Sequence, residues 1–197
     1  MSFNLLESVQ NNLGYPALQK IDPNTQNVLP DEKKSIGDKF SQAAIPAVLT
    51  GLFNFVQSDI GAEAFLKADL TKNWVGVIFN DHKNTVLQTI AAYAGQLGES
   101  IAVKLNAIAN EATKLVKEHL PADAGIKEVK LYFSNQKNNI LLYLPGDLKL
   151  GELLHDNTLD DTTNKMEGPI SSLMQSIGAA FSKPVTGDDI KSHEDSL

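Results

Sequence analysis

Apolar residues recur every three or four positions through most of residues 1–120, which is the spacing of one face of an α-helix. The clearest case is the segment 99–119, where the apolar positions step by four, three, four and three. They are Ile101, Leu105, Ile108, Ala112 and Leu115. The same spacing predicts helices over 2–13, from about residue 31 to 57, after residue 58, and over 82–95. The segment 74–79 suits either a strand or a short helix.

The segment 45–57 is apolar on nearly every side of the predicted helix, a pattern typical of a buried helix. We therefore expect it to lie at the centre of the core. Pro46 lacks a backbone N–H and clashes with the preceding turn, so it should kink or divide the helix. The apolar run is too short to span a bilayer comfortably.

The pattern changes after Pro121. Apolar and polar residues alternate over 127–133, which is the period of a strand, and a polar stretch and then an apolar run follow. We predict a β-hairpin over 127–145. Because a lone hairpin is marginal in water, it needs helices or a second copy to pack against.

These elements predict a mainly α fold with a small β component, α+β overall. A helical, bundle-like domain is expected over 1–122. An appendage made of the hairpin and a helix is expected over 126–182, and a polar, flexible tail over 183–197.

One helical segment resembles a known family. Residues 44–52, AIPAVLTGL, resemble the A-(V/I)-P-A-L-L-x-G-L helix of the YidB-like bacterial proteins, a domain of unknown function. Residues 78–81, IFND, are followed by an Ala-rich helix, a Gly-centred corner and a final helix, and this order is similar to the second block of that family. The likeness covers roughly residues 1–120. It implies an all-helical bacterial domain and implies no activity.

Charge and composition narrow the classes of partner. The chain has 197 residues and a net charge of -7, whereas phosphate groups are bound by clustered basic residues, so nucleic acids and anionic membranes are disfavoured. There is no cysteine, which removes disulfides, thiolate metal ligands and thiol nucleophiles and fits a reducing compartment. The N-terminal residues lack the basic region of a secretory signal. We expect a cytoplasmic protein with no nucleic-acid or membrane partner.

Catalytic motifs do not stand out in the sequence. It contains no P-loop, no dinucleotide fingerprint and no G-x-S-x-G elbow, and no serine has a recognisable base partner. The four histidines show no metalloprotease spacing, and we interpret them as structural or solvated: His82, His119, His155 and His193. We therefore expect that the protein is not an enzyme.

One polar stretch has the spacing of a cation-binding loop. Counted from the first aspartate, oxygen side chains stand at positions 1, 3, 5, 9 and 12, as in an EF-hand-like calcium loop: Asp156, Thr158, Asp160, Asn164 and Glu167. Two positions depart from that pattern, because Asp161 replaces the expected glycine and Thr163 an apolar residue. The segment is thus either a calcium site or a solvated loop that caps the next helix.

The sequence favours a non-catalytic interaction or scaffold protein that binds a protein partner or self-associates as a homo-oligomer through the hairpin edge or the last helix. The alternative is a small-ligand or calcium-binding protein that uses the 156–167 loop. A third possibility, an unrecognised hydrolase, requires a concave pocket with titratable groups. No cofactor other than calcium is expected.

Overall fold

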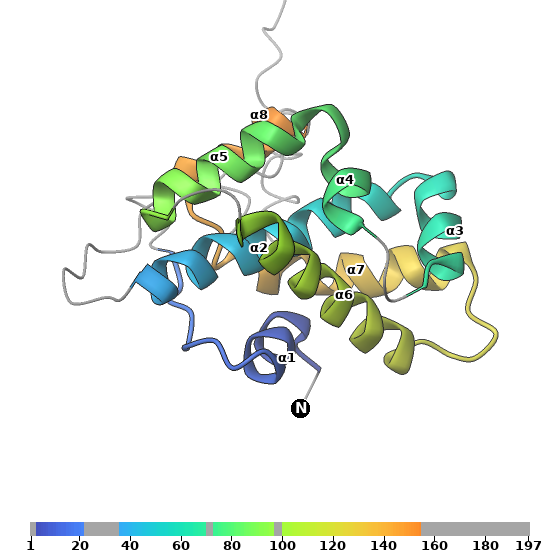
Figure 1. Ribbon diagram of the computed structural model, residues 1–197. Coiled ribbons are helices and arrows are strands. Elements are labelled where there is room, and N and C mark those ends of the chain that lie inside the picture. Colours follow the sequence, from blue (N-terminus) through green and yellow to red (C-terminus); the bar gives the residue numbers. More distant parts are fainter. Residues whose placement is uncertain (1–2, 22–35, 70–72, 97–99, 155–197) are drawn as a thin grey trace, which may run out of the picture. The chain divides into compact units, whose positions relative to one another are not determined.

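The computed structural model describes residues 3–21, 36–69, 73–96 and 100–154. All regular elements in these ranges are helical, so the predicted mainly helical fold is confirmed there. The helices shown in Figure 1 are α1 (Leu5–Asn12), α2 (Ile36–Val56), α3 (Asp59–Lys67), α4 (Trp74–Phe79), α5 (Lys83–Ala94), α6 (Ile101–His119), α7 (Ile126–Leu141) and α8 (Leu150–Leu153). Short 3₁₀ turns lie at Asn80–His82 and Gly146–Leu148.

Helix α2 is the centre of the core, as its apolar sequence predicted. Every residue from Phe40 to Phe53 is buried. Helices α1 and α3 to α7 all pack against it, and in Figure 1 it runs through the middle of the described helices, with α5 above and α1 below. Pro46 lies inside α2 without dividing it.

The ambiguous segment 74–79 is a helix, α4, because neighbouring asparagines satisfy its first backbone N–H groups. Asn73 accepts a hydrogen bond from the N–H of Gly76 at 3.3 Å. Asn106, on α6, accepts one from the N–H of Val75 at 3.0 Å. These caps remove the usual cost of starting a short helix, and the buried side chain of Trp74 then anchors it in the core.

The predicted β-hairpin over 127–145 is wrong, because residues Ile126–Leu141 form the single helix α7. Its buried face steps by four, three and four positions through Val129, Phe133, Gln136 and Ile140, and the last residue, Leu141, is also buried. Two residues disguised this period: Gln136 is polar yet buried, and Leu131 is apolar yet 58% exposed. The apparent polar turn at 134–139 is largely the exposed side of the helix.

All of the described helices belong to one compact unit, Met1–Lys165. Within this unit α6 and α7 both pack on α2. The structure therefore does not divide near residue 122, where the sequence analysis placed a domain boundary.

Buried glutamines hold the irregular segment 13–21 and the first helix in place. The Gln42 side chain accepts a hydrogen bond from the N–H of Gln19 at 2.8 Å and donates to the carbonyls of Gln19 and Tyr143, both at 3.0 Å. Gln136 likewise accepts from the N–H of Leu5 at 3.1 Å and donates to the carbonyl of Phe3 at 3.0 Å. Each amide thereby pairs backbone groups that the core would otherwise leave without partners.

Candidate interaction surface

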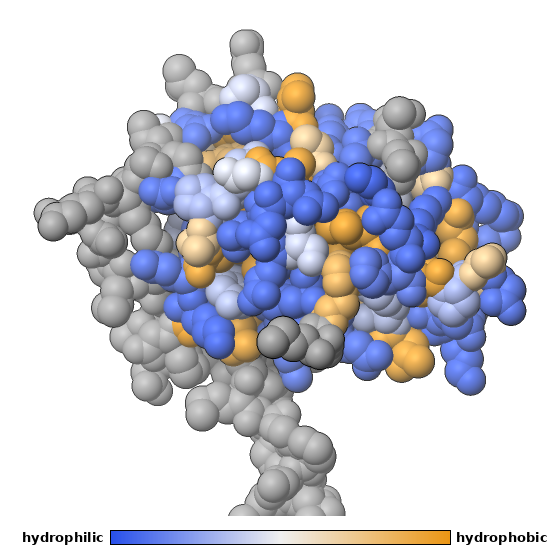
Figure 2. Space-filling model, turned by 90° about the horizontal axis from the view of Figure 1, so that it is seen from below, coloured by the Kyte–Doolittle hydropathy of each residue, from blue (hydrophilic) through white to orange (hydrophobic). Residues whose placement is uncertain are grey.

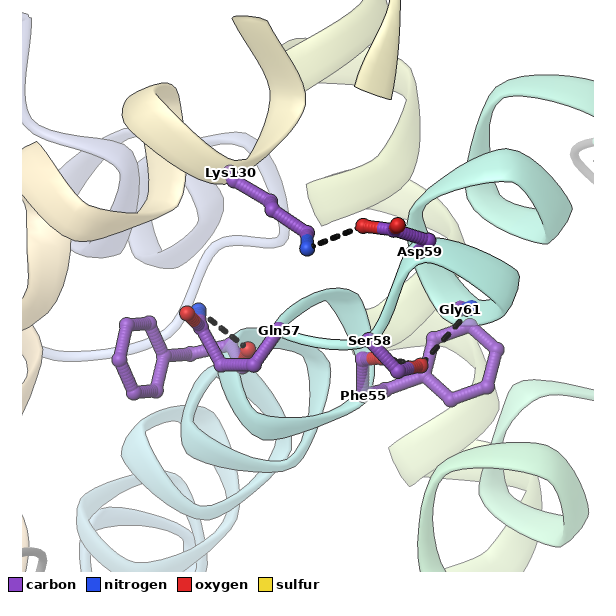
Figure 3. A network of polar contacts seen from close by, with 7 residues as sticks. Phe55, Gln57, Ser58, Asp59, Gly61 and Lys130 are labelled. Atoms are coloured by element: carbon purple, nitrogen blue, oxygen red, sulfur yellow. Dashed lines mark hydrogen bonds and ion pairs between the residues drawn. The ribbon is translucent and has the colours of Figure 1, made fainter. Parts of the chain in front are cut away.

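The corner between α2 and α3 is closed by its own side chains (Figure 3). The Ser58 hydroxyl accepts a hydrogen bond from the N–H of Gly61 at 2.9 Å and donates to the carbonyl of Phe55 at 3.3 Å. The Gln57 side chain donates to the carbonyl of Phe53 at 3.0 Å. These contacts satisfy the last carbonyls of α2 and an N–H of α3, across a bend of 115° between the two helices.

Glycine at position 61 permits this tight corner. A Cβ atom built on Gly61 would lie 1.9 Å from the carbonyl oxygen of Phe55, much closer than atoms can approach. The first turn of α3 therefore sits directly against the last turn of α2, and the position of α3 is fixed by backbone contact.

The other end of α3 is held by a lysine of α6. The Lys117 ammonium donates to the carbonyls of Leu66, at 3.1 Å, and of Ala68. A cation at this place suits the negative end of the helix dipole. Burial lowers the pKa of Lys117, and the nearby Asp69 carboxylate partly offsets that effect. Helix α3 is thus anchored at both ends.

Helices α7 and α3 are joined by an ion pair and by an aromatic contact. The Lys130 ammonium lies 2.6 Å from the Asp59 carboxylate, and the two side chains are 29% and 77% exposed. The rings of Phe65, on α3, and Phe133, on α7, meet edge to face with centroids 5.4 Å apart. Because the exposed ion pair contributes little free energy, the aromatic contact is the stronger of these two contacts.

The residues that follow the two members of this ion pair in the sequence are large, aliphatic and exposed. Ile60, which follows Asp59, is 83% exposed, and Leu131, which follows Lys130, is 58% exposed. We define the Ile60 surface as these two residues with the charged side chains next to them on α3 and α7: Asp59, Ile60, Glu63, Lys67, Lys130 and Leu131. None of these residues belongs to a site predicted from the sequence. For Ile60 the signal was present, since it lies out of register with the buried Ala62 and Phe65.

Exposed apolar residues occur elsewhere in small areas. On the face drawn in Figure 2, orange hydrophobic areas lie among blue hydrophilic residues. Val103, on α6, is 72% exposed. It provides an exposed aliphatic residue outside the Ile60 surface.

The predicted calcium ligands lie outside the described residues: Asp156, Thr158, Asp160, Asn164 and Glu167. Among the residues that the structure describes, no group of three or more His, Asp or Glu side chains is placed to hold a metal ion.

Two of the four histidines fall within the described ranges. The Nδ1 atom of His119 lies 2.7 Å from the carbonyl oxygen of Leu115, and its ring stacks on Phe3 with centroids 3.7 Å apart. These contacts give His119 a packing role between α6 and the N-terminal segment. His82 ends the 3₁₀ turn before α5 and is half-buried.

Considered one at a time, the described helices are each too short or too polar to cross a membrane. Helices α2 and α3 have the necessary length and composition only when they are taken together, across their 115° bend.

Comparisons with protein-family models, with curated proteins and with solved structures found no significant match for this chain.

Proposed function

We propose that this chain is a non-catalytic interaction protein that binds a protein partner through the Ile60 surface. The observation that carries the proposal is the 83% exposure of Ile60 on a helix anchored at both ends. Burying an exposed isoleucine or leucine in an interface contributes about 1.5–3 kcal/mol for each side chain. A helix that is already held in position loses little conformational entropy on binding, so more of that gain remains as affinity.

Charged side chains around an aliphatic centre form the usual arrangement of a binding surface. Ile60 and Leu131 supply apolar area, while Glu63 and Lys67 pair with each other at 2.5 Å and remain more than half exposed. Such rim charges keep the surface hydrated in the free protein and orient the incoming partner.

Membership of the YidB-like bacterial proteins is part of the same proposal. It is supported by the segment 44–52, which lies within the buried helix α2, and it carries with it a bacterial origin. That resemblance implies no activity, which agrees with a binding role.

The proposal is tested with the purified protein immobilised as bait and with two variants of it. Ile60→Glu with Leu131→Glu removes the aliphatic centre, and Val103→Glu makes the same change at the exposed position on α6. We expect a specific protein to be retained by the original chain and by Val103→Glu, and to be lost with the double variant. Retention by all baits alike, or by none of them even when the sample contains the chain itself, would refute the proposal.

Folding of the variants is checked by thermal unfolding. All three positions are exposed, so each substitution should change the free energy of unfolding by about 0.5 kcal/mol or less. A lost interaction with an unchanged melting temperature then reports on the surface itself.

A further inference from the structure

The Ile60 surface is electrically balanced although the chain is acidic. It contains two carboxylates, Asp59 and Glu63, and two ammonium groups, Lys67 and Lys130, whereas the whole chain has a net charge of -7. A surface that meets an identical surface must not repel itself. This balance allows a second copy of the chain to approach here without net repulsion.

The charges along α3 also have a direction. Asp59 and Glu63 come first and Lys67 ends the helix, and all three side chains are exposed. A two-fold axis perpendicular to the helix places α3 of one copy antiparallel to α3 of the other. Each Asp59 then faces the Lys67 of the other copy, which makes two attractive pairs. The two Glu63 side chains meet at the axis, where each is neutralised by the Lys67 of its own helix at 2.5 Å. A parallel arrangement would instead put like charges opposite each other.

The shape of the outer face fits the same arrangement. Ile60, Ala64 and Lys67 follow at helical spacing, and the small, half-buried Ala64 lies beside Glu63 at the middle of the helix. In the antiparallel contact the methylene stem of Lys67 covers Ile60 while its ammonium reaches Asp59. Asp59 is available for this pair because its side chain stays 77% exposed when it binds Lys130.

We propose that the partner of the Ile60 surface is a second copy of this chain, bound with the two α3 helices antiparallel across a two-fold axis. This inference rests on the proposed function, because it names the partner of the same surface. Helix α3 has nine residues and is about 13 Å long, so the contact is small and the dimer belongs to the weak, concentration-dependent class.

The test is the molar mass of the full chain in solution, measured by light scattering after size-exclusion chromatography over a series from micromolar to millimolar concentration. We expect the mass to rise from monomer to dimer. Asp59→Lys and Lys67→Glu, each measured alone, place like charges opposite each other twice. Each should weaken the dimer by about tenfold or more.

An equimolar mixture of the two variants is the decisive sample. Each antiparallel pair in the mixed dimer again joins an acid to a base, so we expect the mixture to dimerise where neither variant does alone. Reduced folding of a variant cannot produce this recovery, and thermal unfolding of each variant measures it directly. The inference is overturned if the original chain stays monomeric throughout, if the single variants dimerise as the original does, or if the mixture fails to recover.

The two proposals fail differently. A monomeric chain that still retains a different protein through Ile60 and Leu131 in the bait experiment overturns self-association and leaves the proposed function standing. A monomeric chain that retains no protein in that experiment overturns both.

Discussion

Replacing Gly61 by alanine tests whether backbone contact fixes α3. The new Cβ would lie 1.9 Å from the carbonyl oxygen of Phe55 and 2.8 Å from the hydroxyl oxygen of Ser58. The nearest atom belongs to the backbone of α2, so no side-chain rotation relieves the clash. The first turn of α3 must move away, and the hydrogen bond from Gly61 to Ser58 is then lost.

The expected change in the free energy of unfolding of Gly61→Ala has three contributions. Overpacking in a close contact costs about 1–3 kcal/mol, and loss of a serine N-cap costs about 1 kcal/mol. Alanine has a better helix propensity than glycine, which offsets about 1 kcal/mol of this loss. The net loss is about 2 kcal/mol in the free energy of unfolding. For a chain of this size it corresponds to a melting temperature lower by about 4–8 °C.

A matched control lies at the same place in the next helix. Gly76 is the third residue of α4, and its N–H binds the N-cap Asn73 as that of Gly61 binds Ser58. A Cβ on Gly76 would have its nearest neighbour at 3.5 Å, an ordinary contact. Gly76→Ala should therefore be neutral, or stabilising by up to about 1 kcal/mol. Urea and thermal unfolding compare the two variants, and equal stabilities would refute the argument.

Three further predictions concern backbone conformation, pH and metal. Asn80 has φ 40° and ψ -119°, a region that suits glycine, so Asn80→Gly should be more stable than Asn80→Ala by about 1–3 kcal/mol in urea unfolding. Hydrogen bonds from the backbone N–H groups of Glu128 itself and of Gly125 hold the pKa of the Glu128 carboxyl below its ordinary value of 4.5. The ionised carboxylate therefore stabilises the fold at neutral pH, and this stabilisation is lost as the pH falls through the folded-state pKa. Melting curves of Glu128→Gln should show a smaller loss on acidification than those of the original chain. If the 156–167 loop binds calcium only in the folded chain, calcium at about a hundred times its dissociation constant should add about 2.7 kcal/mol relative to EDTA. Asp156→Ala should abolish that shift, and its absence in the original chain would remove the calcium interpretation.

Much of the fold follows from the period of apolar residues. The buried helix α2 and the long helix α6 were predicted because their core positions are apolar. The spacing of apolar residues along a helix reflects which of its residues are buried. The conformation of residues 74–79 could not be decided from the sequence, because the helix depends on a hydrogen bond from Val75 to Asn106. Asn106 lies on a different helix and leaves no local signal in the sequence.

Helix α7 was missed for a related reason. Its buried face includes Gln136, whose amide is paired with the backbone of Phe3 and Leu5, more than 130 residues earlier in the chain. A sequence pattern counts such a residue as solvent-facing, because the partner that makes its burial favourable is not visible locally. Ile60 was overlooked although its exposure could be inferred from the sequence, since it lies out of register with the buried Ala62 and Phe65.

The buried helix α2 has a consequence for synthesis of the chain. It ends at Val56, whereas one of its main packing partners, α7, is complete only at Leu141. At about 5–20 residues per second, the ribosome needs about 4–17 s to make the intervening chain. During that interval the apolar sides that α7 later covers stay open to other molecules in the cell. The nascent chain should therefore depend on chaperones at this stage, and truncation before Ile126 should yield an aggregating product.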